Sequence, residues 1–229
     1  INMLTDGNNT QDWLHTNCIS YNGDLNQVVI SSRFTNEFYV IDHSTTIQES
    51  QSHLGGLYGR GGDILYRWGN PQNYNRGTNA DKILGAQHGV DWIPPGYPGE
   101  GNFILFNNQH EFYGPGNPNS ISAILEIQAP IDLEGFYEIS DFNPFLPDNP
   151  IVVYQDDFFS NFQSGAFRLP NGNTIITSTA NSLIFEVNQL GEVELTYEDY
   201  SPARAIKYNY DYFVSIQGDI NQDNIVNIL

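Results

Sequence analysis

Two runs of alternating polar and apolar residues open the chain, at 15–21 and 27–33, and Asn22-Gly23-Asp24 joins them. A period-two pattern interrupted by Asn-Gly is the strongest short-range signal for a β-hairpin. Antiparallel strands fold the chain back on itself. We therefore expect Arg33, at the end of the second strand, to return to the end of the hairpin where His15 begins the first.

The same alternation recurs along the chain and predicts three units of four strands each. The first unit covers about 12–69, the second about 85–155 and the third about 164–199. A polar, glycine-rich segment at 42–62 is expected to be a long loop. The expected strands are 15–21, 27–33, 37–41 and 63–68; then 87–93, 102–107, 123–128 and 135–140; then 164–169, 173–179, 183–187 and 192–197, with a run at 204–208 that would start a fourth unit.

His15, His88 and Ser164 occupy equivalent positions in the three units, at the start of the first strand of each unit. His15 lies eight residues before Gly23, and Ser164 lies eight residues before Gly172. His88 precedes a comparable turn, which is longer by an insertion around 94–98. Residues at equivalent positions of successive units come together in space if the units are arranged around an axis.

Four-stranded units that repeat every 40 to 75 residues or so are typical of β-propeller blades. We predict an all-β fold with about three antiparallel four-stranded blades and part of another. The innermost strands would line a channel, at whose mouth His15, His88 and Arg33 could meet. Three blades and a fragment do not close a ring, and open sheet edges are a liability. Since the chain begins with Ile1, we favour missing upstream blades over a partner chain as the closing element.

Composition narrows the possible partners. Hydrophobic residues make up 39% and aromatic residues 14%, which favours a packed core over disorder. The net charge of −19 disfavours nucleic acid and anionic membranes as partners. No apolar run is long enough for a membrane span. The single cysteine, Cys18, excludes an internal disulfide and is expected to be a small buried hydrophobe.

The end of the chain carries a partial calcium-loop pattern. Asp219, Asn221 and Asp223 fall at the first, third and fifth positions of such a loop, and Asn227 at the ninth. The twelfth position would lie beyond Leu229. The segment 214–229 resembles the first half of a dockerin-type repeat, so Ca²⁺ is a candidate ligand there, and a polar tail is the alternative. The propeller is then expected to cover 1–213.

Several motifs together resemble the bacterial PAPS-independent arylsulfotransferases. The resemblance covers roughly 12–212 and rests on DWLHTNCISYN followed by VVISSR, then GGDILYRWGNP, then AQH followed by GEGNFILFNN, and RLPNGNTIITSTANSLIFEV. The most specific elements are a His-x-Asn strand, an arginine eighteen positions after that histidine, and a Gln-His pair before a glycine-rich turn.

The resemblance implies a six-bladed propeller that transfers a sulfuryl group from an aryl sulfate to a phenol through a sulfohistidine. His88 matches the histidine that becomes sulfated, and His15 and Arg33 match residues that hold the sulfate oxygens. No metal is required for this chemistry. Another histidine of the family, and in some members a tyrosine, come from upstream blades, so activity is expected of the full-length protein. A secreted, periplasmic or cell-surface location is expected.

Four further residues are candidates for substrate contacts, each with a structural alternative. Asn17 and Gln87 could orient groups in the site or satisfy backbone atoms. Trp92 could stack on an aryl ring or pack between blades. Arg204 could line the channel or form a surface ion pair. At the level of function, the alternative to an enzyme is a non-catalytic secreted propeller that binds an anionic or aromatic ligand at the cell surface. A purely structural propeller, with the three residues apart, is a third possibility.

Overall fold

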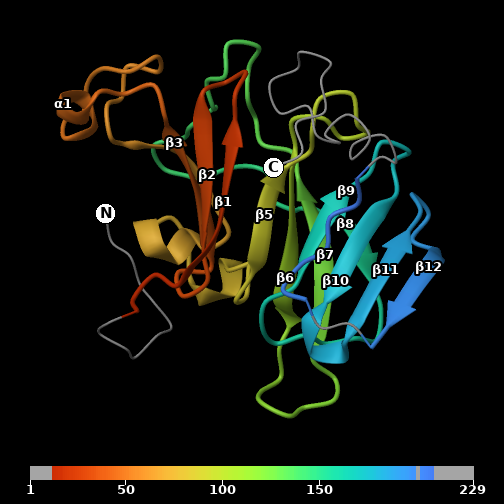
Figure 1. Cartoon of the computed structure of the whole chain (residues 1–229). Helices are drawn as coiled ribbons and strands as arrows, with labels where there is room; N and C mark the ends of the chain where they lie inside the picture. Colours follow the sequence, from red (N-terminus) through yellow and green to blue (C-terminus); the bar gives the residue numbers. More distant parts are fainter. Residues whose placement is uncertain (1–11, 200–201, 209–229) are drawn as a thin grey trace, which may run out of the picture.

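The computed structural model describes residues 12–199 and 202–208, and within them twelve strands form three four-stranded antiparallel sheets (Figure 1). This confirms the predicted all-β fold built from propeller-like blades. Each sheet is a meander in chain order, with hydrogen bonds between successive strands. The strands are β1 (Thr16–Asn22), β2 (Gln27–Ser32), β3 (Glu37–Asp42) and β4 (Ile64–Trp68); β5 (His88–Trp92), β6 (Phe103–Glu111), β7 (Ile121–Ile127) and β8 (Ile151–Gln155); and β9 (Gly165–Arg168), β10 (Thr174–Ser178), β11 (Leu183–Val187) and β12 (Val193–Glu198).

The helical elements are short and lie in the connections. The expected loop at 42–62 contains α1 (Ile47–Ser50), whose N-terminus is closed by a capping box between Thr46 and Glu49. The 3₁₀ turns are η1 (Pro71–Tyr74), η2 (Asn79–Asp81) and η3 (Thr179–Asn181). Among the described residues, no helix has the length and apolar character needed to cross a bilayer.

The first hairpin forms as predicted, but its turn is longer than Asn22-Gly23-Asp24. Asn22 pairs with Gln27, so the loop spans 23–26. Asn26 takes the left-handed conformation, with φ of 50°, and the Asn22 side chain accepts a hydrogen bond from the Leu25 amide at 3.0 Å. Asparagine tolerates this conformation because its short side chain can bond locally. The predicted hairpin is therefore confirmed, with residues 23–26 as its loop.

The predicted strand at 135–140 is also wrong, because the fourth strand of the second sheet is β8 at Ile151–Gln155. Residues 129–147 instead leave the second sheet and lie against the first; we call this segment the strap. The Trp68 indole donates to the Pro147 carbonyl at 2.8 Å, and the Tyr66 hydroxyl donates to the Leu146 carbonyl at 2.6 Å. The strap therefore satisfies polar groups of the first sheet that would otherwise be buried without partners.

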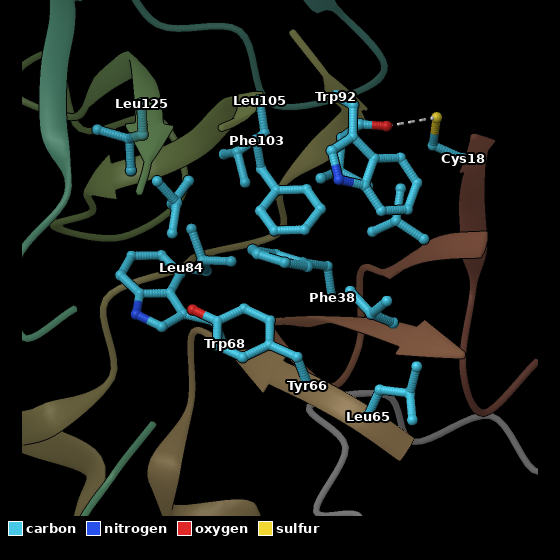
Figure 2. Packing of buried hydrophobic residues seen from close by; sticks show 14 of the residues in the cluster. Cys18, Phe38, Leu65, Tyr66, Trp68, Leu84, Trp92, Phe103, Leu105 and Leu125 are labelled. Atoms are coloured by element: carbon cyan, nitrogen blue, oxygen red, sulfur yellow. Dashed lines mark hydrogen bonds between the residues drawn. The ribbon is translucent and has the colours of Figure 1, made fainter. Parts of the chain in front are cut away.

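A hydrophobic core lies between the first and second sheets, and another lies between the second and third. Strand β6 serves both, because alternate residues point to opposite faces. Phe103 packs against Phe38, with ring centroids 4.8 Å apart, and against Trp92 at 5.1 Å (Figure 2). Ile104 and Phe106 face the third sheet. Burial on both faces explains why this strand reads as a continuous apolar run.

The described part of the segment after β12 contains no strand, so the expected start of a fourth sheet at 204–208 is not seen. This stretch runs along the third sheet instead. The Ala205 amide donates to the Thr177 hydroxyl at 2.8 Å, and Lys207 pairs with Glu186 at 2.6 Å. The proposed calcium ligands Asp219, Asn221 and Asp223 lie outside the described residues.

Candidate functional site

The innermost strands β1 and β5 are joined by side chains rather than by a backbone ladder. The Asn17 amide donates to the Gln87 carbonyl at 2.7 Å, and the Cys18 thiol donates to the Val90 carbonyl at 3.1 Å (Figure 2). Further along, the Ser20 hydroxyl donates to the Asp91 carboxylate. These contacts hold the two strands in register, so that His15 and His88, which precede and begin them, lie at the same end.

Both strands are irregular where the histidines occur. The β1–β2 pairing is interrupted between Thr16 and Cys18, and the β5–β6 pairing between His88 and Asp91. Bulges of this kind change the direction of neighbouring side chains and are frequent beside functional sites. Gly89, in the second bulge, has φ of 68°, and a Cβ there would lie 3.3 Å from the Gly165 Cα. Glycine thus permits the close approach of β5 and β9.

His15 is fixed by its own hairpin and by Asp12. Its backbone is left-handed, with φ of 50°, and its carbonyl accepts from the Arg33 amide at 3.2 Å. The Asp12 carboxylate accepts from the His15 amide at 3.0 Å and contacts Nδ1 of the ring at 2.6 Å. A carboxylate only accepts, so the proton of this contact lies on Nδ1.

His88 lies beside His15, with ring centroids 6.5 Å apart and planes at 80°. Only 7% of His88 is exposed. Its Nδ1 lies 2.8 Å from Oδ1 of Asn108 and 3.0 Å from the carbonyl of Ala86. Both partners are acceptors, so Nδ1 carries the proton and the lone pair of the neutral ring is on Nε2.

Arg33 completes the cluster. Its guanidinium lies over the Phe34 ring, 5.2 Å from the centroid, and the same ring lies 4.9 Å from that of His15. Burial lowers the pKa of His88, and the nearby charges of Arg33 and His15 lower it further, whereas the bond to Asn108 opposes this. His88 is consequently neutral at pH 7, next to a permanent cation.

The third repeated position does not add a catalytic group. Ser164 is buried, and its hydroxyl contacts the Ser160 hydroxyl at 2.9 Å and accepts from the Thr179 amide at 3.2 Å. Its backbone, with φ of 80°, is left-handed like that of His15. His15 and Ser164 thus share a left-handed backbone just before the first strand of their sheets, whereas His88 lies within β5 and the left-handed residue there is Ala86.

Asn17 and Gln87 lie in the wall of the site and hold neighbouring strands. Gln87 is fully buried, and its amide nitrogen donates to the carbonyls of Ser32 and Glu37 at 3.0 and 2.8 Å. The side-chain oxygens of both Asn17 and Gln87 are buried, and no hydrogen-bond partner is found for them among the described residues. The contacts of these two side chains are made through their amide nitrogens, and they connect neighbouring strands.

The other two candidates differ in burial and in the residues that they contact. Trp92 is 7% exposed and packs in the core against Phe103, so its ring is not a free stacking surface. Arg204 lies on the segment after β12, where its Nη1 is 3.8 Å from the Cys18 sulfur. It lies along the inner strands, where its Cβ is 3.3 Å from the position that a Cβ on Gly165 would take, and its charge lowers the pKa of Asp91 against the dominant, raising effect of burial.

The remaining histidines are dispersed. His43 and His53 are exposed and contact Asn26 and Asp63. His110 lies at the end of β6, where burial lowers its pKa. Among the described residues, no group of three or more His, Cys, Asp or Glu side chains is arranged to hold a metal ion.

Asp12 and Asn108 are the functional residues that sequence reasoning missed. Asp12 lies three residues before His15, so a local pairing was open to inference. Asn108 offers only a weaker signal, because it is a polar residue within the apolar run of β6. Its meeting with His88 depends on strand register, since His88 pairs with Phe106.

The arrangement can bind a tetrahedral anion and attack it. Arg33 supplies a planar fork of donors suited to such an anion. His15 supplies a second polar ring beside that of His88. His88 presents a neutral imidazole whose Nε2 is the nucleophilic atom. On a chain with 27 acidic and 8 basic residues, this local grouping of three nitrogen bases is distinctive.

Comparisons with known proteins do not identify the chain. No family model matches it, and no curated protein matches it. Among solved structures, a Bacteroides caccae protein of unknown function is similar, with 12% identity, a TM-score of 0.42, and coverage of 80% of this chain and 45% of that one. Virginiamycin B lyase from Staphylococcus aureus gives 11% identity, a TM-score of 0.35, and coverage of 86% and 61%. This chain therefore spans less than two thirds of either protein, and likeness at this level identifies neither a family nor a reaction.

Proposed function

We propose that this protein transfers sulfuryl groups from aryl sulfate esters to phenols, with His88 as the transient acceptor. The observation that supports this most strongly is the pairing of His15 and His88, 6.5 Å apart, with Arg33 close enough to influence the His88 pKa. These are the three residues that the resemblance to arylsulfotransferases assigns to sulfuryl transfer. They are far apart in sequence and adjacent in space.

In the first half-reaction, the Nε2 lone pair of His88 attacks sulfur, and a nitrogen–sulfur bond forms as the bond between sulfur and the aryl oxygen breaks. The electrons of that bond leave with the aryloxide. The ring then carries a positive charge, with its Nδ1 proton in place. Arg33 stabilises the sulfonate oxygens, on which charge is spread in a loose transition state like that of phosphoryl transfer. His15 can donate to them only when its Nε2 also carries a proton, and this proton then passes to the departing aryloxide, which leaves Nε2 free.

In the second half-reaction, a phenol oxygen attacks sulfur and the nitrogen–sulfur bond breaks, which returns His88 to its neutral form. The phenol loses one proton, which His15 can accept at Nε2 while Asp12 holds its Nδ1 proton. No metal takes part in these steps.

The test is an assay of the complete natural protein with p-nitrophenyl sulfate and a phenol acceptor. We expect release of nitrophenolate that depends on the acceptor, and a fall of at least 10³-fold or so in the variant His88→Ala, because the nucleophile is lost. His110→Ala is a matched control, since it removes a partly buried histidine away from the cluster.

Two outcomes would contradict the proposal. Equal turnover by the wild type and His88→Ala would remove His88 from the chemistry. Tight binding of the aryl sulfate without product release would indicate instead a binding protein for anionic aromatic ligands.

A further inference from the structure

Asn108 holds the imidazole of His88 from the side opposite to the proposed substrate. Its Oδ1 lies 2.8 Å from His88 Nδ1, and both groups are buried. An amide side chain can present either its oxygen or its nitrogen to a neighbour, and only the oxygen would impose a proton on Nδ1. The orientation of this amide therefore decides the tautomer of His88.

The third sheet's entry loop, residues 159–164, fixes that orientation. The Asn108 amide nitrogen donates to the carbonyls of Ser160, at 2.8 Å, and Gln163, at 3.1 Å. Both amide hydrogens are thereby used on acceptors. A flipped amide would place its oxygen against two carbonyl oxygens, so the observed orientation is the only one that satisfies every group.

The loop is itself rigidly held. The Ser122 hydroxyl donates to the Asn108 carbonyl at 2.7 Å and accepts from the Ser160 amide at 3.0 Å. Ser160 and Ser164 join their hydroxyls at 2.9 Å. Gln163 and Ser164 both have positive φ, of 47° and 80°, a conformation that costs energy for residues other than glycine and persists only where the surroundings impose it.

We propose that Asn108, oriented by the 159–164 loop, is a positioning residue that holds His88 with its proton on Nδ1 and its lone pair on Nε2. The third sheet has Ser164 in place of a histidine at the equivalent position. It contributes to the site through the carbonyls of Ser160 and Gln163, which precede its first strand. The kinetic consequence of this inference rests on the proposed function, whereas the tautomer does not.

The alternative is that Asn108 only satisfies the loop and that the Ala86 carbonyl, 3.0 Å from Nδ1, is sufficient by itself. Whether Nδ1 is held by both acceptors or by Ala86 alone affects the chemistry of the ring. During sulfuryl transfer the ring becomes cationic, and two carbonyl-type acceptors on Nδ1 stabilise that charge better than one. A ring in the opposite tautomer would present N–H to the sulfate donor in place of a lone pair.

The first experiment is ¹⁵N NMR of histidine-labelled wild-type protein at neutral pH, with long-range correlations that distinguish the two ring nitrogens. We expect a protonated Nδ1 and an unprotonated Nε2 for His88. Assignment uses the spectrum of His88→Ala. A protonated Nε2 in the wild type would overturn the proposal without any variant having to fold.

The second experiment repeats the spectrum for Asn108→Leu, which keeps a similar volume but has no acceptor. We expect a measurable population with the proton on Nε2. Ser160→Ala should give a smaller shift in the same direction, because the loop loses the Ser160–Ser164 contact. The control is Ser178→Ala, another buried serine of the third sheet, whose hydroxyl accepts from Asn181 at 2.7 Å. An unchanged tautomer in Asn108→Leu would show that Ala86 alone suffices.

The third measurement is the pH profile of nitrophenolate release. We expect kcat/KM of Asn108→Leu to fall by about 10²-fold or more, as for other sites in which an imidazole is held in the wrong tautomer. The acidic limb should also move to lower pH, because the bond to Asn108 raises the His88 pKa. If the tautomer responds as expected but the wild type shows no turnover, the proposed function fails and the positioning role stands.

Discussion

His88 is a titratable ring held among groups that disfavour its charged form, and this gives a pH dependence of stability. Burial and the charges of Arg33 and His15 put the pKa of the folded state below the ordinary value of 6.5. Between these two values the unfolded chain binds more protons than the folded protein. The stability associated with neutral His88 is therefore fully present above about pH 6.5 and falls as the pH decreases through that window.

The measurement is urea unfolding of the wild type and His88→Asn at pH values of about 7.5 and 5. We expect the free energy of unfolding of the wild type to fall more than that of the variant, since other groups titrate equally in both. A larger acid-induced loss in the variant would contradict the assignment.

At the scale of residues, the sequence indicated His15, Arg33 and His88 because each has a recognisable spacing. Their proximity follows from the strand pattern. Their partners Asp12 and Asn108 were not predicted, although the short spacing between Asp12 and His15 left that pairing open to inference. Asp12 pairs with His15 through a local left-handed turn, and Asn108 reaches His88 through strand register across the second sheet. A linear pattern specifies neither.

At the scale of elements, the strap is the feature that hydrophobic alternation did not predict. The segment around Tyr137 has the residue types of a strand, but it packs on a neighbouring sheet instead of joining its own. Tyr137 donates to the side-chain oxygen of Gln27 at 2.9 Å, and the Gln27 amide donates to the Gly135 carbonyl at 3.0 Å. Such long-range pairing depends on tertiary structure, whereas the eleven other predicted strands within the three sheets needed only local alternation and turn residues.

The contact between the strap and Gln27 predicts that the variant Tyr137→Phe is less stable than the wild type. The change leaves the side-chain oxygen of fully buried Gln27 without this donor, so we expect a loss of about 1 to 3 kcal/mol in the free energy of unfolding, measured in urea. Tyr113→Phe is the control, because Tyr113 is 60% exposed and its hydroxyl donates to Glu111 at an exposed contact. Its effect should stay within about 0.5 kcal/mol. Equal effects of the two changes would argue against a structural role of the strap.

At the scale of the molecule, the second sheet packs against the first on one face and against the third on the other. The outer faces of the first and third sheets are left uncovered. On the first sheet, Ile19 and Tyr21 are 69% and 55% exposed, on the face away from the second sheet. On the third, Tyr197 of β12 is 49% exposed. The sequence predicted the number of sheets but not which side chains join them.

The hydrophobic core between the first two sheets leads to a prediction about the free energy of unfolding of the whole fold. Phe103→Ala removes a ring that contacts Phe38 and Trp92, and we expect a loss of about 3 to 5 kcal/mol. Because this ring bridges two sheets, near-UV and far-UV circular dichroism should report the loss together. Leu195→Ala on exposed β12 is the control, with an expected cost below about 1 kcal/mol. A similar cost at both positions would contradict the assignment of this core.

The strap also affects the order in which parts of the nascent chain can fold during translation. Trp68 and Tyr66 of the first sheet donate to the carbonyls of Pro147 and Leu146. These acceptors are synthesised roughly eighty residues after the donors. A nascent chain that has completed the first four strands therefore still lacks the partners of two buried side chains, and it acquires them only when most of the second sheet has emerged. The first two sheets are thus best regarded as a single unit of co-translational folding.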